Sequence, residues 1–319
     1  MKIALDAMSG DHAPQEMVKG AVVASRENGL AVGLVGRPEV IEAELRKHET
    51  HNLKLDIFPA EEVIGADEPA TKAIKRKPKS SIAVGLRLLK EGKAAAFVSA
   101  GNTGALVSSA ILTLGRKGGI ARPALALPLP SLHHPVLFLD VGANSDCKPQ
   151  YLMQFAQMGE VYMRKVYRIS RPRIGLLSNG EEEIKGNSLV RAAHQLLKES
   201  ELNFIGNVEG HNLFSGVADV VVTDGFTGNM AIKWGEGVVR FFTQLSRQML
   251  GNGPLFGAAL EEVERRIFDD TTLGGAPLLG VQGNVIKAHG WSNARAIQKA
   301  LLLAQQLAEQ GVAETIRVG

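Results

Sequence analysis

The chain has 319 residues, of which 45% are hydrophobic and 22% are charged, a balance typical of a soluble globular protein with an ample core. The formal net charge of +3 is too small for a dedicated nucleic-acid-binding protein; it suits an anionic substrate or an acidic partner, or carries no functional meaning. The only cysteine is Cys147, which excludes an intrachain disulfide and favours a reducing compartment.

The apolar pattern predicts a cytoplasmic protein. Asp6 and Asp11 interrupt the apolar residues at the start of the chain, so we expect no signal-peptide core there. The longest uncharged stretch covers residues 123–139 and contains four prolines, which predicts two strands around a bend. A membrane-spanning helix would instead need ~20 apolar residues. Contact of the protein with a membrane surface stays open.

Short apolar runs alternate with helical patterns along almost the whole chain. The first strand, at residues 2–7, precedes a helix over 10–29 that has a proline in its first turn and ends at Asn28 and Gly29. Further strands are expected at residues 31–36, 53–60, 94–100, 136–142, 174–178, 204–206 and 217–224. Further helices are expected at residues 38–48, 80–92, 103–115, 151–167, 187–200 and 292–311. This alternation predicts βαβ units in a single α/β domain, residues 1–319, with a mostly parallel sheet.

One segment departs from this alternation. Two helical stretches follow each other within about residues 236–270, joined by an uncharged turn, with no strand between them. The pattern predicts a helical hairpin that leaves the domain, with Leu250, Leu255 and Phe256 near its tip. Exposed apolar side chains of this kind usually mark an interface, so we expect the tip to meet a membrane surface, an acyl chain or a partner subunit.

Five of the expected strands end in loops rich in Gly, Asn, Asp and Thr. These loops read GNTGA, VGANSD, SNGEEEIKGN, NVEGHN and DGFTGN. In a parallel sheet such exits share the carboxyl edge, where open α/β folds bind ligands. Glycine allows close approach of the backbone, and a helix N-terminus attracts anions. The same residues also form ordinary tight turns, but five such loops favour a site for phosphate or another anion.

Several familiar motifs are missing from the sequence. It has neither a P-loop nor a Gly-x-Gly-x-x-Gly fingerprint after the first strand, which disfavours a P-loop nucleotidase and a standard dinucleotide site. No Gly-x-Ser-x-Gly elbow is present, which disfavours a serine hydrolase. The eight histidines show no spacing typical of paired metal ligands, and we predict no structural zinc.

Attack of phosphate on a thioester suits loops of this composition. Phosphate is largely ionised at neutral pH, and a thiol with a pKa of ~8.5 leaves readily as a thiolate, so the reaction needs little acid or base catalysis. The remaining task is to hold an anion beside a carbonyl and to stabilise the developing oxyanion. Backbone N–H groups, amides and a lysine can do this work.

Five motifs carry a resemblance to a known family. ALDAMSGDHAP, SAGNTGAL, DVGANSDCKP, LLSNGEEEIKGN and VVVTDGFTGNMAIK occur in the order found in bacterial phosphate acyltransferases of glycerolipid synthesis, which nearly the whole chain resembles. The resemblance implies a Rossmann-like three-layer α/β/α sandwich related to phosphotransacetylases and isocitrate-dehydrogenase-like proteins. It implies that the enzyme forms acyl phosphate from acyl-acyl carrier protein and inorganic phosphate, without a metal or organic cofactor. It further implies a homodimer, peripheral association with the membrane, and delivery of the product to a membrane-bound glycerol-3-phosphate acyltransferase.

Three residues are the main catalytic candidates. Lys185 would bind phosphate or stabilise the oxyanion, a role that the resemblance favours over that of a solvated lysine paired with the neighbouring glutamates. Asn229 would donate its amide to the carbonyl or to phosphate, unless it only caps a helix. His12 could donate to phosphate or protonate the leaving thiolate, although a loop histidine without a special role fits equally well.

Other polar or small residues of the same loops are candidates for phosphate binding. They are Asp11, Gly101, Asn102, Thr103, Asn144, Asp224, Thr227 and Gly228. Turn formation and helix capping are the alternative roles, and Asp224 is expected to orient its loop rather than to act as a base. Cys147 has no histidine near it in the sequence, so we expect it to pack rather than to form an acyl-enzyme.

Two groups of basic residues suit the docking of an acidic carrier protein. They are Lys75, Arg76, Lys77 and Lys79 in one group and Arg265 and Arg266 in the other. A basic run is usually only a solvated face, which is the alternative interpretation here.

Three rival functions stay open at this point. A phosphate acetyl- or butyryltransferase that uses coenzyme A would share the chemistry. An NAD-dependent dehydrogenase would share the related fold, and it is disfavoured weakly by the missing glycine fingerprint. A membrane-associated scaffold would need neither a catalytic lysine nor the polar loops.

Overall fold

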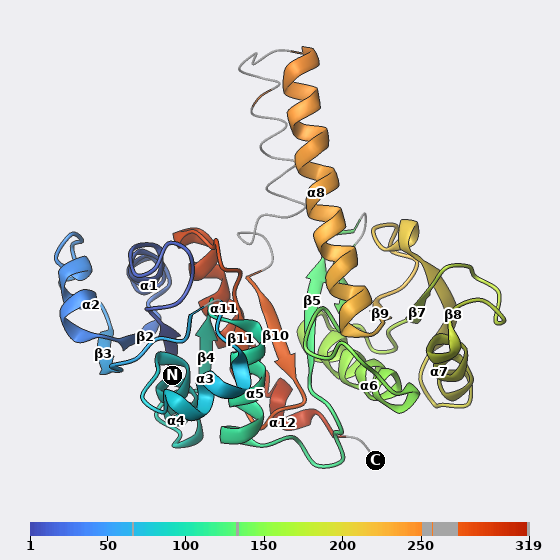
Figure 1. The fold of residues 1–319 in the computed structure, drawn as a ribbon, viewed down its shortest axis with the longest axis horizontal. Helices are drawn as coiled ribbons and strands as arrows, with labels where there is room; N and C mark the ends of the chain where they lie inside the picture. Colours follow the sequence, from blue (N-terminus) through green and yellow to red (C-terminus); the bar gives the residue numbers. More distant parts are fainter. Residues whose placement is uncertain (66, 132–133, 251–256, 258–273, 318–319) are drawn as a thin grey trace.

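The structure is a computed structural model that describes residues 1–65, 67–131, 134–250, 257 and 274–317, and Figure 1 shows its elements along the chain. The strands are β1 (Lys2–Asp6), β2 (Ala31–Gly36), β3 (Leu55–Pro59), β4 (Ala96–Ser99), β5 (Ala124–Leu129), β6 (Val136–Leu139), β7 (Ile174–Ser178), β8 (Phe204–Glu209), β9 (Val220–Val222), β10 (Ala276–Leu279) and β11 (Asn284–Lys287). The helices are α1 (Gln15–Asn28), α2 (Pro38–Leu45), α3 (Ala70–Arg76), α4 (Ser81–Lys90), α5 (Thr103–Leu114), α6 (Pro149–Val166), α7 (Ser188–Lys198), the 3₁₀ helix η1 (Gly210–Asn212), α8 (Gly225–Leu250), α11 (Ala294–Glu309) and α12 (Val312–Thr315).

The described strands form one sheet of eleven in the order β3-β2-β1-β4-β11-β10-β5-β6-β9-β7-β8. Seven of its ten neighbouring pairs are parallel, which confirms the predicted mostly parallel sheet. The three antiparallel pairs, β11–β10, β10–β5 and β5–β6, lie together in the middle of the sheet. They separate a first parallel group (β3, β2, β1, β4 and β11) from a second parallel group (β6, β9, β7 and β8).

The two parallel groups run in opposite directions. Three successive antiparallel pairings lie between them, so β6 and its parallel neighbours run against β4 and its neighbours. The carboxyl ends of β6, β7, β8 and β9 therefore lie at one end of the sheet, and that of β4 lies at the other. The prediction that the five polar strand exits share one edge is wrong for β4, because the reversal depends on the pairing of distant strands.

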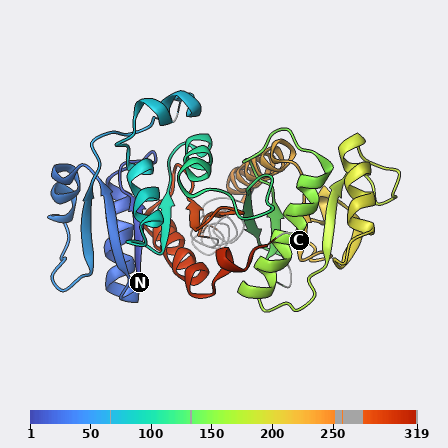
Figure 2. The same ribbon diagram turned by 90° about the horizontal axis from the view of Figure 1, so that it is seen from below.

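Helices cover both faces of the sheet, as the predicted three-layer sandwich requires, and Figure 2 shows them above and below it. On one face a continuous core spans both parallel groups and includes Met17 of α1, Phe155 of α6 and Ile297 of α11. On the other face the core is divided into two parts. One part surrounds Phe97 beneath α4 and α5, and the other surrounds Phe138 beside α8.

A seam lies between the two parts of the divided core. Leu127 of β5 and Val141, just after β6, are partly buried, and each packs against both parts. Ile232 of α8 packs against the Phe138 part. The seam therefore follows the central strands where the direction of the sheet reverses, and α8 lies along one side of it.

Helix α8 leaves the sheet as one long helix and projects far from it in Figure 1. It begins at Gly225, so it is already helical before the hairpin that was expected within about 236–270. Exposed apolar side chains along it include Phe226, Trp234 and Phe241. Five positions with predictions lie outside the described residues or lack a described side chain: Leu250, Leu255, Phe256, Arg265 and Arg266. Across the part of the chain that the structure describes, no helix is both long and apolar enough to span a bilayer.

Asparagine caps explain where three of the helices begin. The side-chain oxygens of Asn102, Asn187 and Asn293 accept hydrogen bonds from backbone N–H groups three residues further on, at the starts of α5, α7 and α11. Gly29, with φ 66°, ends α1, as the predicted helix stop requires. The exit of β4 thus passes directly into the N-terminus of α5.

Candidate active site

A cavity of about 680 Å³ opens along the seam. The exits of β1, β4 and β11 form one wall, through residues 8–11, 100–104 and 287–290. Helix α8 forms the opposite wall through Asn229, Ile232, Lys233 and Glu236. The floor comes from the central strands, with Leu125, Leu127 and Leu129 of β5 and with Gly275 and Ala276 at the start of β10. The cavity therefore lies on the face of the sheet, between the two parallel groups.

A buried carboxyl organises the first wall. Asp6, at the end of β1, accepts hydrogen bonds from the Ser99 hydroxyl at 2.8 Å and from the Met8 N–H at 3.1 Å. The Ser99 hydroxyl in turn accepts the N–H of Gly101 at 3.1 Å. Burial raises the pKa of the Asp6 carboxyl, and the hydrogen bonds from its serine and backbone partners act in the opposite direction. This network holds the loops after β1 and β4 side by side.

The N-terminus of α5 faces the cavity. Asn102 caps the helix by accepting the Ala105 N–H at 2.9 Å, and its amide nitrogen donates to the Glu68 carbonyl at 3.3 Å. The first turn of a helix leaves backbone N–H groups without partners inside the helix and carries the positive end of its dipole. Because residues 101–104 line the cavity, this end of α5 offers a place for an anion.

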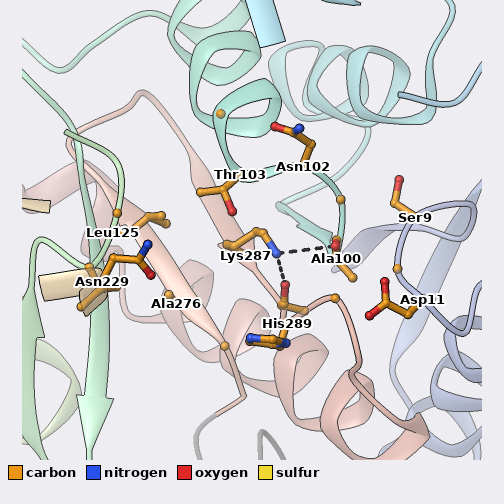
Figure 3. A pocket seen from close by; sticks show the side chains of 18 of the residues that line it. Ser9, Asp11, Ala100, Asn102, Thr103, Leu125, Asn229, Ala276, Lys287 and His289 are labelled. Atoms are coloured by element: carbon orange, nitrogen blue, oxygen red, sulfur yellow. Dashed lines mark hydrogen bonds between the residues drawn. The ribbon is translucent and has the colours of Figure 1, made fainter. Parts of the chain in front are cut away.

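Lys287 brings a positive charge to the same wall. It is the last residue of β11, and it is in register with Ala276 of β10 and with Ser99 of β4. Its ammonium donates to the Ala100 carbonyl at 3.5 Å and also to the Ala288 carbonyl. In Figure 3 the ammonium lies between Thr103 and Ala100, close to the start of α5. The ammonium and the helix N-terminus can therefore act on the same anion.

The opposite wall depends on how α8 begins. Asp224 caps the helix, since its carboxylate accepts the Thr227 N–H at 2.9 Å and the Thr227 hydroxyl at 2.7 Å. Gly228 lies directly against the Asp140 backbone, where an added Cβ would be 1.9 Å from the carbonyl oxygen. This close contact aims the next residue, Asn229, into the cavity, and Figure 3 shows its amide beside Leu125.

Asp140 fixes the loop against which α8 packs. Its buried carboxylate accepts N–H groups of Leu125 at 3.0 Å, Ala143 at 3.0 Å and Asn144 at 2.7 Å. The side-chain amide of Asn144 donates to the same carboxylate at 2.8 Å and to the Pro123 carbonyl at 2.7 Å. Burial raises the pKa of the Asp140 carboxyl, and these hydrogen bonds oppose the shift.

A histidine joins the two walls. The ammonium of Lys233 lies 3.3 Å from Nε2 of His289 and 3.2 Å from a carboxylate oxygen of Glu236. The His289 ring stacks on Trp291 with 4.7 Å between centroids, and Arg240 lies 3.7 Å from the Trp291 centroid. Burial lowers the pKa of His289 to about 4, and the neighbouring cations add to this effect. The imidazole is therefore neutral near pH 7, and it can accept a hydrogen bond from Lys233 while Nδ1 carries the ring proton.

The structure brings five of the predicted site residues together. Asp11, Gly101, Asn102, Thr103 and Asn229 all line the cavity. Six others lie outside its lining: His12, Asn144, Lys185, Asp224, Thr227 and Gly228. Asn144 supports the Asp140 loop, whereas Asp224, Thr227 and Gly228 place the start of α8. These four residues therefore support the elements that line the cavity without lining it themselves.

Lys185 lies in an exposed loop between β7 and α7. Its N–H donates to the Glu182 carbonyl at 3.0 Å, and the Asn207 amide donates to the same carbonyl at 2.9 Å. Glu183 pairs with Lys198 at 2.6 Å rather than with Lys185. The neighbouring glutamates thus help to anchor the loop. The catalytic role of Lys185 stays a prediction, separate from the lining of this cavity.

Cys147 is partly buried against the main core. Burial, followed by the nearby carboxylate of Asp140, raises the pKa of its thiol to about 12. The thiol is therefore protonated at neutral pH and a poor nucleophile. This environment agrees with the packing role that the sequence suggested.

The sequence reasoning missed Lys233, Lys287 and His289. No strand was assigned to residues 275–290, although two short apolar runs, APLL and NVIK, lie there between glycines. The second run ends in KAHG, a polar strand exit like the others, and this was the signal for Lys287 and His289. Lys233 could have been found from its spacing of four residues after Asn229 on one helix face.

Lys75 and Arg76 of the first basic group lie at the end of α3, and Lys77 and Lys79 follow that helix. α3 packs on α5, and the loop before it, residues 63–65, lines the cavity. Lys77 is held by Glu68 and by the Val63 carbonyl, and Lys79 pairs with Glu61 at 3.0 Å. Lys75 and Arg76 are exposed.

No group of three or more His, Cys, Asp or Glu side chains in the described ranges is arranged to hold a metal ion. The side chains that line the cavity include the cations Lys233 and Lys287, amide and aliphatic groups, and the carboxylates of Asp11 and Glu236.

The same fold occurs in solved structures of other enzymes. A phosphotransacetylase from Streptococcus pyogenes aligns with a TM-score of 0.66 and 19% identity, covering 97% of this chain and 94% of that chain. A 4-hydroxythreonine-4-phosphate dehydrogenase from Klebsiella pneumoniae aligns with a TM-score of 0.59 and 14% identity, covering 96% and 99%. The chain thus has the α/β fold shared by phosphotransacetylases and these dehydrogenases, which confirms the predicted fold class.

The sequence narrows this class to one family. The profile of the family described as "Fatty acid synthesis protein" matches residues 1–315. A phosphate acyltransferase from Heliobacterium modesticaldum is 49% identical over 325 residues, covering 99% of this chain and 97% of the relative. Another from Dictyoglomus turgidum is 48% identical over 328 residues, covering 100% and 97%. The chain belongs to this family of phosphate acyltransferases and is an enzyme, as its sequence motifs predicted.

Proposed function

We propose that this enzyme transfers a fatty acyl group from acyl-acyl carrier protein to inorganic phosphate, in the service of phospholipid synthesis. An oxygen of hydrogen phosphate forms a bond to the thioester carbonyl carbon, and the carbon–sulfur bond breaks. The electron pair leaves with sulfur, and the proton of hydrogen phosphate ends on the thiol. The products are acyl phosphate and the free thiol of the carrier.

The observation that carries this proposal is the joint placement of Lys287 and the α5 N-terminus on one cavity wall. Phosphate would be held there by the ammonium, by the free N–H groups of the first helical turn and by the Thr103 hydroxyl. A fixed anion needs only to be aligned with the carbonyl, because it is already ionised at neutral pH. The wall therefore supplies binding and orientation rather than a strong base.

The opposite wall supplies donors for the developing oxyanion. Asn229 and Lys233 are four residues apart on the cavity face of α8. An amide and an ammonium in this arrangement stabilise negative charge on the carbonyl oxygen during the attack. His289 acts as a positioning residue, because its neutral ring accepts from Lys233 and holds that ammonium toward the cavity.

The partners proposed for the enzyme follow from the same reaction. The exposed Lys75 and Arg76, at the end of the helix that packs on α5, suit an acidic carrier protein, and Lys77 and Lys79 follow them in the chain. A homodimer, peripheral association with a membrane, and transfer of acyl phosphate to a membrane-bound glycerol-3-phosphate acyltransferase remain part of the proposal. The exposed apolar side chains of α8 are compatible with an interface.

The first test is phosphate-dependent consumption of palmitoyl-acyl carrier protein, followed through the released thiol. Lys287→Met should lower kcat/KM by about 10²–10³, because it removes a charge that acts on the reacting anion. Its matched control is Lys90→Met, at the exposed end of α4, which should stay within about twofold of the wild type. Equal activity of Lys287→Met and Lys90→Met would contradict the proposed phosphate site.

The same assay decides the role of Lys185. A loss in Lys185→Ala comparable with that in Lys287→Met would support its predicted part in catalysis, and activity within twofold would reduce it to a solvated lysine. Palmitoyl-coenzyme A and butyryl-coenzyme A run beside the carrier-protein substrate distinguish a coenzyme A-dependent phosphotransacylase. A calorimetric titration with NAD tests the dehydrogenase alternative. No consumption of any thioester in the presence of phosphate would leave the scaffold interpretation.

A further inference from the structure

The floor of the cavity carries a row of three leucines. Leu125, Leu127 and Leu129 alternate along β5 with residues that face the opposite side, and all three line the cavity. Ala126 belongs instead to the continuous core on the far face of the sheet. Three alternate residues of a strand span about 13 Å from the first to the last. This leucine row makes the floor of the cavity apolar, whereas the first wall is polar.

Small residues face the row across the cavity. The register of β10 and β5 covers the pairs Leu278–Leu125 and Leu279–Ala124, at one end of the two strands. Toward the other end the strands diverge in Figure 1, and Gly275 and Ala276 line the cavity on the side of β10. Side chains of this size leave the space between the strands open.

Further apolar lining comes from other elements. Ile232 of α8 lines the cavity, and Val63 and Ile64 contribute from the loop after β3. Leu127 is partly buried between the two parts of the divided core, whereas Leu125 and Leu129 are almost fully buried. Leu127 is therefore the member of the row with the most freedom to contact a ligand.

The polar and apolar parts of the cavity meet at Ala276. It is in register with Lys287, so the two side chains lie on the same face of neighbouring strands. Figure 3 shows Ala276 close to Leu125 and Asn229, with Lys287 further toward Thr103 and Ala100. A ligand with its reactive carbonyl between Lys287 and Asn229 would thus place an apolar tail directly on the leucine row.

We propose that the leucine row is the subsite for the hydrocarbon chain of the acyl donor, and that Leu127 and Ala276 set the chain length that the enzyme accepts. The inference rests on the proposed transfer to phosphate and adds the location of the chain. An acetyl group would leave almost the whole row unused. In an apolar pocket a single methylene changes kcat/KM by roughly tenfold or more, so a row of this length discriminates strongly between long and short chains.

The test is the chain-length profile of Leu127→Phe, which adds bulk where the side chain faces the cavity. We expect the ratio of kcat/KM for palmitoyl-acyl carrier protein to that for butyryl-acyl carrier protein to fall at least tenfold, with butyryl transfer within about threefold of the wild type. The matched control is Leu112→Phe on α5, which is 72% exposed and outside the lining, and its ratio should be unchanged. Ala276→Val narrows the cavity from the other side and should shift the ratio in the same direction.

A direct binding measurement accompanies the kinetics. The fluorescent fatty acid cis-parinaric acid should bind the wild type, be displaced by palmitate, and bind Leu127→Phe at least tenfold more weakly. Thermal unfolding shows which of Leu127→Phe and Ala276→Val folds. The proposal is overturned if a folded variant keeps the wild-type ratio of kcat/KM for palmitoyl and butyryl donors. An equal loss for palmitoyl and butyryl donors also overturns it, because the row would then contact the common carrier arm rather than the chain.

The failure of the chain subsite and the failure of the proposed function give different results. If the wild type consumes no thioester with phosphate, the function fails, and palmitate-displaceable binding that Leu127→Phe weakens still supports an apolar subsite. If the wild type transfers both acyl groups and both variants keep its ratio, the function stands and the subsite fails. If neither variant folds, absence of displaceable binding by the wild type overturns the subsite and its presence supports it.

Discussion

Gly228 offers a sharp test of how the start of α8 is positioned. A Cβ at this residue would lie 1.9 Å from the Asp140 carbonyl oxygen and 3.0 Å from the Asp140 carbonyl carbon. The obstacle is backbone, and that backbone is held by the hydrogen bonds to the Asp140 side chain. Gly228→Ala therefore forces α8 or the loop to move by about 1 Å. Overpacking of this kind costs about 1–3 kcal/mol, which exceeds the roughly 0.5–1 kcal/mol that alanine gains over glycine in a helix.

Gly237 is the matched control, because it lies on the same helix and a Cβ there would meet nothing within 4 Å. We expect urea unfolding to show Gly228→Ala destabilised by about 1–2 kcal/mol and Gly237→Ala stabilised by roughly 0.5–1 kcal/mol. In the acyl-transfer assay Gly228→Ala should also lose about 10²-fold in kcat/KM, because Asn229 is the next residue and a 1 Å displacement is costly. Equal stability and equal activity of the two variants would refute the account of how α8 is placed.

Three further predictions concern titratable groups. Because the pKa of His289 is lowered, the folded protein binds a proton there more weakly than the unfolded chain does. The contribution of the neutral ring to stability is therefore complete above pH ~6.5 and is lost as the pH falls toward 4. The fall in the free energy of unfolding from pH 7 to 4.5 should be smaller in His289→Gln than in the wild type, and an identical fall would contradict this prediction. Asp140→Asn should cost about 1–3 kcal/mol, since an amide N–H₂ would face backbone donors, whereas the exposed Asp146→Asn should be neutral in the same unfolding experiment. The pKa of about 12 at Cys147 implies slow reaction with Ellman's reagent at pH 8 and full activity of Cys147→Ala, and a fast reaction or an inactive variant would contradict it.

Much of the fold could be predicted from local patterns. The final helix, expected over residues 292–311, is α11, Ala294–Glu309, and the proline-rich stretch at 123–139 forms β5 and β6 around a bend. Such elements follow from periodicity, caps and turn residues within a few positions of each other. The strands β10 and β11 were not predicted, because each is a short run that directly follows a glycine, and β10 contains a proline. Their pairing reverses the sheet, and strand direction is decided by partners that lie far apart in the sequence.

The difference between local patterns and long-range pairing also explains which site residues could be predicted from the sequence. Asn102 and Thr103 line the cavity because β4 feeds directly into α5, a relation that the motif itself encodes. Lys287 reaches that wall only because β11 pairs with β4 across almost two hundred residues of sequence. Lys233 reaches His289 only because α8 runs back over the reversed part of the sheet. The position of each of these two cations at the cavity therefore depends on long-range topology, which the local sequence does not reveal.

The reversal also explains why the cavity can be both polar and apolar. In a uniformly parallel sheet, polar strand exits gather at one edge and the face of the sheet is covered by helices. Here the direction changes over β10, β5 and β6, so the helices of the two groups part above β5, and α8 crosses the gap from the exits of the second group toward those of the first. The proposed anion site at the strand exits therefore lies beside the apolar face of β5 that lines the cavity. The proposed transfer of a fatty acyl group to phosphate needs these two surfaces side by side, and the antiparallel centre of the sheet brings them together.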